Sequence, residues 1–199
     1  KDIGEFGRHT DAEDNSTTQL HMVEEPDVKQ INSLEELKKC TDSLLKEPRI
    51  AFDIISDVRS SSMTAEIFGF GIKGDNIFVY IPIYNEKTQN CVMEASLLDD
   101  GHGLEEEKIK GLKLCDVLDC LKPIFENDRT VKLCHDVKFK RVLLRRNGVE
   151  IKGTLFDSMI ASYLADPLDK NLELADIVAK WLNCLVPSMN DILNCRMND

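Results

Sequence analysis

The fold prediction rests on residues 49–83, which have the sequence RIAFDIISDVRSSSMTAEIFGFGIKGDNIFVYIPI. It contains three short runs rich in Ile, Val and Phe, at 49–55, 66–72 and 76–83. Each run has the length and composition of a β-strand. Gly74-Asp75 separates the second run from the third and predicts a tight hairpin. The stretch therefore predicts three adjacent antiparallel strands.

Helices and further strands surround this stretch in the sequence. Upstream, Ser33 and Glu36 have the spacing of a capping box, which predicts a helix that Pro48 ends. Downstream, apolar residues at helical spacing predict a helix from about 106 to 127. The later elements are a strand at 131–133, a helix at 137–147 stopped by Gly148, an extended piece at 153–156, a helix from Asp157 to Ala165, and a helix at 172–182. This order predicts an α/β fold with a mixed central sheet flanked by helices.

The composition fits one ordinary domain with a tail. The chain has 199 residues, of which 42% are hydrophobic and 31% charged, so it can bury a sizeable core. Residues 1–30 carry eight acidic and three basic side chains and few large apolar ones, which predicts a flexible tail or linker before a domain at 31–199. No apolar run reaches the roughly 18 residues that a membrane span needs, so we expect no membrane association.

Charge and cysteine content exclude two classes of protein. The net charge of −11 argues against a protein that coats DNA with its whole surface. The seven cysteines include no Cys-x-x-Cys pair, which argues against a zinc ribbon. We expect reduced thiols in an intracellular protein that is monomeric.

Residues 138–167, KFKRVLLRRNGVEIKGTLFDSMIASYLADP, resemble the 3′–5′ exonuclease domain of family A (polymerase-I-type) DNA polymerases. A Leu-Ala to Trp-Leu helix at 174–182 and the segment IAFDIISD at 50–57 extend the resemblance over about residues 30–185. The resemblance implies a ribonuclease-H-like (DnaQ-like exonuclease) fold. It also implies a site where four carboxylates hold two Mg²⁺ or Mn²⁺ ions that cleave a phosphodiester.

Most of the implied metal ligands are replaced in this chain. The Asp-x-Glu motif of the first strand retains Asp53 but has Ile55 in place of the glutamate. The Asn-x-x-x-Asp motif falls on Asp136 and Lys140, so a lysine stands where the family has a metal-binding aspartate. The third motif, Tyr-x-x-x-Asp, would lie after Trp181, where the chain has no tyrosine, so the domain is either cut before that helix or has lost the motif.

A lysine in this position opposes metal binding. An ammonium about 4 Å from a divalent ion is repelled by roughly 8 kcal/mol at an effective dielectric of about 20. We therefore expect no functional catalytic residues and no metal cofactor. We also expect Lys140 to pair with Asp53 in place of the metal, while Ile55 fills the vacated space. Asp157 is expected to cap a helix, and Trp181 to pack the last helix onto the sheet.

Two alternatives remain open at this point. Asp53, Asp57 and Asp136 are candidates for a rearranged metal site in an active exonuclease that uses Mg²⁺ or Mn²⁺. The second alternative is a stand-alone interaction module that has the exonuclease fold without its activity.

A basic cluster is the remaining functional feature. Residues 130–152 carry seven basic and two acidic side chains, against the acidic balance of the whole chain. The candidates for contact with DNA phosphates, against the alternative of a solvated helix face, are Lys138, Lys140, Arg141, Arg145 and Arg146. The leading hypothesis is an inactive exonuclease-like domain. It would support a covalently linked polymerase domain used in DNA replication or repair, and contact DNA weakly or indirectly.

Overall fold

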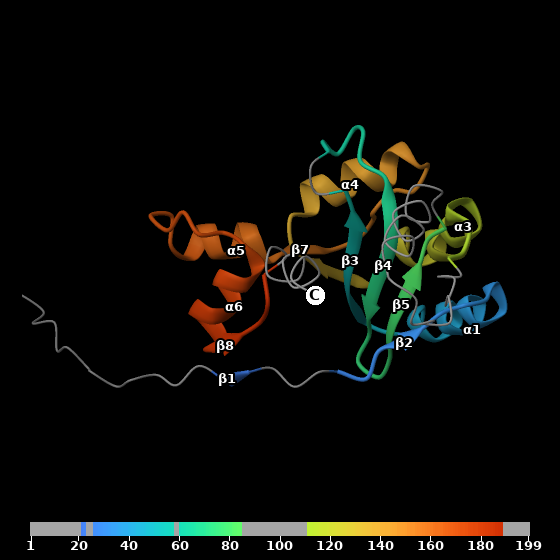
Figure 1. Ribbon diagram of the computed structural model, residues 1–199, viewed down its shortest axis with the longest axis horizontal. Helices are drawn as coiled ribbons and strands as arrows, with labels where there is room; N and C mark the ends of the chain where they lie inside the picture. Colours follow the sequence, from blue (N-terminus) through green and yellow to red (C-terminus); the bar gives the residue numbers. More distant parts are fainter. Residues whose placement is uncertain (1–20, 23–25, 58–59, 85–110, 189–199) are drawn as a thin grey trace, which may run out of the picture.

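The computed structural model describes residues 21–22, 26–57, 60–84 and 111–188. In this part of the chain a six-stranded sheet has the order β2-β5-β4-β3-β6-β7, and β1 pairs separately with β8 (Figure 1). The strands are β1 (His21–Met22), β2 (Lys29–Gln30), β3 (Arg49–Ser56), β4 (Ile67–Lys73), β5 (Phe78–Pro82), β6 (Val131–Cys134), β7 (Leu155–Asp157) and β8 (Cys184–Leu185). The helices are α1 (Leu34–Leu44), α3 (Leu114–Phe125), α4 (Val137–Arg146), α5 (Ser158–Ala165) and α6 (Leu174–Leu182).

The centre of the sheet confirms the predicted antiparallel meander. β4 pairs antiparallel with both β3 and β5, whereas β6 and β7 add in parallel on the other side of β3. The hairpin loop is longer than the predicted Gly74-Asp75 turn. Lys73 pairs with Phe78, and the Gly74 N–H donates to the Ile77 carbonyl at 2.8 Å. The result is the mixed sheet of an α/β fold.

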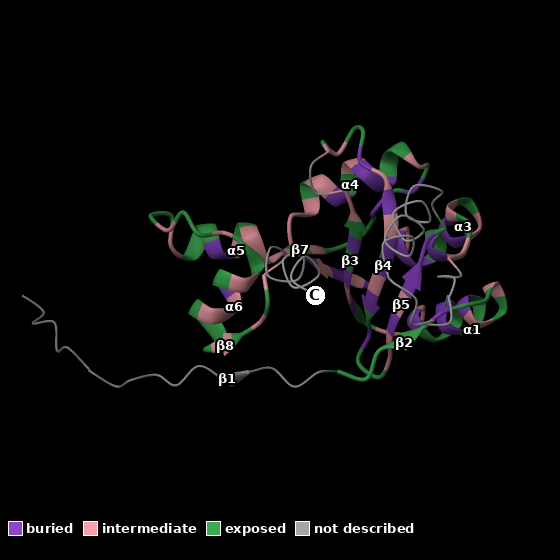
Figure 2. Cartoon of the chain, viewed as in Figure 1, coloured by how far each residue is buried: buried purple, intermediate pink, exposed green. Residues whose placement is uncertain are grey.

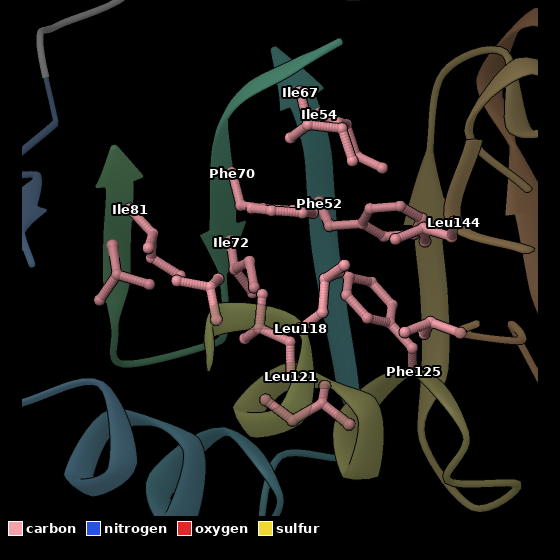
Figure 3. Close-up of a cluster of buried hydrophobic side chains, with 14 of the residues drawn as sticks. Phe52, Ile54, Ile67, Phe70, Ile72, Ile81, Leu118, Leu121, Phe125 and Leu144 are labelled. Atoms are coloured by element: carbon pink, nitrogen blue, oxygen red, sulfur yellow. The ribbon is translucent and has the colours of Figure 1, made fainter. Parts of the chain in front are cut away.

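One face of the sheet packs on helices and forms the core. Because side chains alternate along a strand, β3 directs Ile50, Phe52 and Ile54 into this core. Residues of α1, α3 and α4 complete the same cluster. Figure 3 shows its part around Phe52 and Phe125, with Leu118 and Leu121 of α3 and Leu144 of α4. These two rings meet edge to face with centroids 5.1 Å apart. Each fully buried side chain of this size contributes roughly 1.5–3 kcal/mol of burial free energy, which makes this face the main source of stability.

The first predicted helix is confirmed together with its cap. The Ser33 hydroxyl accepts a hydrogen bond from the Glu36 N–H at 3.3 Å. The Glu36 carboxylate accepts in return from the Asn32 N–H at 3.3 Å, one residue before the position expected in a capping box. α1 therefore begins where the sequence pattern indicates.

The helix predicted from about 106 is wrong at its start, since α3 begins at Leu114. Leu112 instead bridges to Ile83, with its N–H donating to the Pro82 carbonyl at 2.9 Å. The predicted residues 106–110 lie outside the described part of the chain.

Two short strands occur inside the predicted tail. β2 pairs in parallel with β5 at the edge of the sheet, and β1 pairs in parallel with β8. The other tail residues lie mostly outside the described part, so the boundary at residue 30 remains a prediction. None of the described helices is long and apolar enough to cross a membrane.

Candidate functional site

The second face of the sheet carries the residues that the sequence motifs single out. Along β3, Asp53 and Ala51 lie on the face opposite Phe52. Asp53 pairs with Gly71 of β4, and a side-chain carbon at Gly71 would meet nothing within 4 Å. Within the described part of the chain, the sheet face beside Asp53 is therefore open.

A cavity of about 510 Å³ lies on this face. Its walls combine apolar side chains with a few polar ones. The lining residues are Ala51, Phe52, Asp53, Gly71, Lys73, Phe78, Leu133, Cys134, His135, Phe156, Ser158 and Leu174. Lys73, Phe78, Ser158 and Leu174 had not been identified as site residues from the sequence. The alternation of the strands that carry Lys73 and Phe78, in register with Ala51, is the signal that could have found those two.

Lys140 and Asp53 form the ion pair that the sequence predicts. The Lys140 Nζ lies 3.1 Å from Asp53 Oδ1 and also donates to the His135 carbonyl. The Lys140 side chain comes from α4 and is only 9% exposed, whereas the Asp53 side chain is 61% exposed. The ammonium is thus held by two oxygen acceptors at the edge of the open face.

One part of the predicted arrangement is wrong. Ile55 is 37% exposed, so it does not fill the space that a metal would leave. The Asp53 side chain is also largely in contact with solvent. Both side chains are exposed because none of the described residues covers this face of the sheet beside β3.

The other two candidate metal ligands have structural partners. Asp136 is the N-cap of α4, where its carboxylate accepts from the Phe139 N–H at 3.3 Å. Asp57 accepts from the Ser60 hydroxyl at 2.7 Å. Among the described residues, no three His, Cys, Asp or Glu side chains are grouped so that they could share a metal ion. The site therefore does not fit the two-metal arrangement that the resemblance implies, and the absence of a metal cofactor remains a prediction.

Asp157 caps two helices, which confirms and extends its predicted role. Its carboxylate accepts from the Met159 N–H of α5 at 2.9 Å. It also accepts from the N–H groups of Asp136 and Val137, at 3.1 and 2.7 Å, where α4 begins. One side chain thus ties the start of α4 to the start of α5.

Burial and charge shift two titrating groups beside the ion pair. Burial, and then the Lys140 charge, hold the pKa of His135 below its usual value, and its Nδ1 lies 3.0 Å from the Ser158 hydroxyl. Burial raises the pKa of the Cys134 thiol to about 12. A neutral imidazole and an unreactive thiol therefore line the cavity near neutral pH.

The predicted basic cluster separates into exposed and engaged side chains. Lys138, Arg141 and Arg145 are exposed along one stripe of α4, at helical spacing, and we call them the α4 basic stripe. Arg146 is also exposed, but its guanidinium donates to the Ala65 carbonyl. Lys140 is buried against Asp53, so it does not belong to this exposed surface. In the described chain no ion pair engages Lys138 or Arg141, and Arg145 lies 3.9 Å from an exposed Glu150.

Comparisons with known proteins agree with this fold. Residues 116–188 match the family model of the DNA polymerase I ribonuclease H-like domain. The chain superposes on Escherichia coli RNase D, an exoribonuclease involved in structured RNA processing, with a TM-score of 0.57 at 12% identity, over 81% of this chain and 35% of that one. The exonuclease domain of Aedes aegypti Nibbler gives a TM-score of 0.56 at 14% identity, over 87% and 78%.

Pol1 of M. smegmatis, solved with a DNA primer-template and dNTP, gives a TM-score of 0.55 at 16% identity. The match covers 79% of this chain but 23% of that one. The chain thus spans about a third of RNase D and about a quarter of Pol1. At these identities the likeness establishes the fold, which is the ribonuclease-H-like exonuclease fold.

Proposed function

We propose that this chain, whose residues 116–188 match the ribonuclease H-like domain family of DNA polymerase I, is an exonuclease-like domain that does not hydrolyse DNA. Its role would be to support the polymerase portion of a family A DNA polymerase that acts in replication or repair. The Lys140–Asp53 pair, at 3.1 Å, is the observation that carries the proposal.

The chemistry of the pair argues against catalysis. In-line cleavage of a phosphodiester by this family requires two divalent ions held by several carboxylates. Here one half-solvated carboxylate, Asp53, faces an ammonium that two oxygen atoms already hold. A divalent ion at this point would have to displace Lys140 and would then have one carboxylate ligand, with Ile55 where the family places the second.

A nuclease assay with the unmodified chain tests this proposal. A 3′-labelled single-stranded oligonucleotide is incubated with the chain and Mn²⁺ or Mg²⁺, with calorimetry to detect metal binding. We expect neither shortening of the strand nor heat of metal binding. Release of nucleotides from the 3′ end that disappears in Asp53→Asn would overturn the proposal, because Asn cannot supply the ligand charge. Release that persists in Asp53→Asn would come from a different site or a contaminating enzyme.

The α4 basic stripe supports weak contact with the DNA backbone. Its three cations lie on one exposed helix face, and two of them have no ion-pair partner among the described residues. Such contacts neutralise phosphates without identifying bases, so they guide a strand and do not select a sequence.

A charge-reversal experiment tests the contact. Lys138→Glu/Arg141→Glu is compared with Lys38→Glu/Lys39→Glu, which makes the same charge change on the exposed surface of α1. We expect the first variant to bind labelled DNA more weakly. The slope of log affinity against log salt concentration should also become shallower by the contribution of about two phosphate contacts, each of which releases about 0.7–0.9 counterions. Equal weakening by both variants would mean that only net charge matters, and the stripe would then have no specific role.

A further inference from the structure

A serine hydroxyl and an imidazole meet in the cavity of the open sheet face. The His135 Nδ1 lies 3.0 Å from the Ser158 Oγ, which is hydrogen-bond distance. Both side chains line the cavity and are only partly buried, and neither side chain takes part in the Lys140–Asp53 ion pair. A hydroxyl in contact with an imidazole is the arrangement in which a general base activates a serine nucleophile. The pair is therefore a candidate for nucleophilic catalysis.

One carboxylate fixes the backbone beside both members of the pair. Asp157 immediately precedes Ser158, and its carboxylate accepts from the N–H of the residue that follows Ser158, at 2.9 Å. The same carboxylate accepts from the N–H groups of the two residues that follow His135, at 3.1 and 2.7 Å. Because a single acceptor ties the two backbone segments together, the hydroxyl and the ring are held at reacting distance before a substrate binds. Asp157 is thus a positioning residue for the pair.

The position of Ser158 in the fold also suits a nucleophile. Ser158 is the first residue of α5 and directly follows the end of β7, and serine hydrolases place their nucleophile at such a turn from a strand into a helix. The partial positive charge at the start of α5 favours the negative charge that develops during attack on a carbonyl. Farther along α5, the Ser162 hydroxyl accepts from Trp181 Nε1 at 3.1 Å, which anchors the helix to α6. Trp181 is 49% exposed, so it is not enclosed against the sheet as the sequence suggested.

The charges around the imidazole suit a base that takes up a proton and returns it. Burial, and then the Lys140 charge, lower the pKa of His135, so the ring is neutral near neutral pH. With its proton on Nε2, the ring can accept the Ser158 O–H through Nδ1. The carboxylates of Asp157, Asp136 and Asp53 act on the pKa in the opposite direction. They therefore stabilise the imidazolium that forms once the proton has moved.

The cavity walls favour an uncharged substrate with an apolar group. Its volume of about 510 Å³ lies within the range of small-molecule sites. Figure 2 shows exposed and intermediate residues at β7 and the start of α5, so the described chain leaves this part of the cavity open to solvent. One acidic and one basic side chain, Asp53 and Lys73, lie among the lining residues and balance in charge. The apolar lining side chains are Ala51, Phe52, Phe78, Leu133, Phe156 and Leu174. This combination favours a carboxylic ester over a phosphodiester.

We propose that Ser158 and His135 are the nucleophile and general base of a metal-independent esterase site for small carboxylic esters with an apolar acyl group. Ser158 Oγ bonds to the ester carbonyl carbon while its proton moves to His135 Nδ1. The bond from this carbon to the leaving oxygen then breaks, the departing alcohol takes the proton, and acyl-Ser158 remains. Water, deprotonated by His135, hydrolyses the acyl group to the free acid and restores the hydroxyl. The inference does not rest on the proposed function, because it needs neither a metal nor DNA.

Hydrolysis of p-nitrophenyl acetate and butyrate by residues 1–199 in EDTA tests the inference, since EDTA removes metal-dependent hydrolysis. The exposed Cys115 thiol reacts with such esters, so every variant also carries Cys115→Ser. We expect Ser158→Ala and His135→Gln each to lower the rate at least tenfold, and mass spectrometry to find the acyl group on Ser158. Ser158→Cys should still be acylated, because a thiol can replace the hydroxyl as the nucleophile. Ser61→Ala, at an exposed serine far from the cavity in sequence, should leave the rate unchanged.

Three outcomes decide between an esterase site and a structural hydrogen bond. An equal rate in Ser158→Ala, or acyl groups on lysine and cysteine side chains alone, would overturn the inference. The full-length gene product is assayed in the same way, because polypeptide that covers the cavity there would block the pair. Acylation of Ser158 in residues 1–199 but not in the full-length protein would also overturn the inference, whereas similar rates in both would support it. Nuclease activity with Mn²⁺ would contradict the proposed function alone, since it leaves acylation of Ser158 in EDTA unaffected.

Discussion

The unequal exposure of the two partners makes the Lys140–Asp53 pair a sharp test of the site. The Lys140 side chain is 9% exposed and the Asp53 side chain 61%, so water can replace the partner of Asp53 but hardly that of Lys140. Removing the carboxylate leaves a nearly buried ammonium with the His135 carbonyl as its remaining acceptor. Removing the ammonium leaves a carboxylate that water solvates. We therefore expect Asp53→Ala to cost more stability than Lys140→Met.

The distance sets the scale of the difference. At 3.1 Å, two unit charges attract by about 1.3 kcal/mol at the dielectric of water and about 5 kcal/mol at an effective dielectric of 20. Because the carboxylate is more than half exposed, the value nearer water applies, and we expect Asp53→Ala to cost about 2 kcal/mol. In Lys140→Met, relief from burying a charge offsets most of the lost hydrogen bond, so we expect a change of about 0.5 kcal/mol or less.

Urea unfolding of the two single variants and the double variant, followed by circular dichroism, measures these terms. The free energy of unfolding of Asp53→Ala/Lys140→Met should equal that of Lys140→Met alone, since Asp53 no longer has a partner to lose. An equal loss of stability in Lys140→Met and Asp53→Ala, or simple addition of the two single effects in the double variant, would show that the buried ammonium does not depend on Asp53 in this way.

Three further substitutions probe Asp157, His135 and the two glycines with positive φ. Asp157→Ala removes the acceptor of three backbone N–H groups at the starts of α4 and α5, and it should cost about 2–3 kcal/mol in urea unfolding, with Asp157→Asn intermediate. Because the pKa of His135 is lowered in the folded state, its contribution to stability is present above about pH 6.5 and is lost as the pH falls through the folded pKa. His135→Asn should therefore flatten the decline in stability between about pH 7 and pH 5, and an unchanged slope would contradict the shift. Gly153 and Gly148 both have φ near +79°, but a side-chain carbon at Gly153 would lie 2.7 Å from a backbone oxygen, whereas Gly148 has open space. Gly148→Ala should cost about 1 kcal/mol and Gly153→Ala clearly more, so equal melting temperatures would count against this account.

Local patterns predicted the framework of the fold because the forces behind them are local. The Ser33 cap, the three strand runs of β3 to β5 and the stop at Gly148 depend on residues within a few positions of each other, and the structure agrees with each. The start of α3 was wrong because a long-range bridge from Ile83 to Leu112 overrides helical periodicity. Strands of two residues, such as β1, pair through the backbone and have no side-chain pattern to read.

The sequence predicted which two side chains of the site form an ion pair, but it did not predict how far the side chains of the site are exposed to solvent. Charge complementarity between Lys140 and Asp53 follows from the motif positions, and it was confirmed at 3.1 Å. The exposure of Ile55 and Asp53 depends on what covers the sheet face, which no local pattern reports. The double role of Asp157 escaped prediction for a similar reason, because one of the two helices that it caps begins 20 residues before it in the sequence.

The ion pair also constrains how positions 53 and 140 can change over evolutionary time. A carboxylate at position 140 with Asp53 unchanged would face a like charge where an ammonium now stands, and the repulsion would favour protonation of one of the two. An uncharged residue at position 53 would leave the Lys140 ammonium without its carboxylate partner. The two positions are therefore expected to vary together among relatives of this chain, and a return to acidic residues at both requires a cation to arrive at the same step.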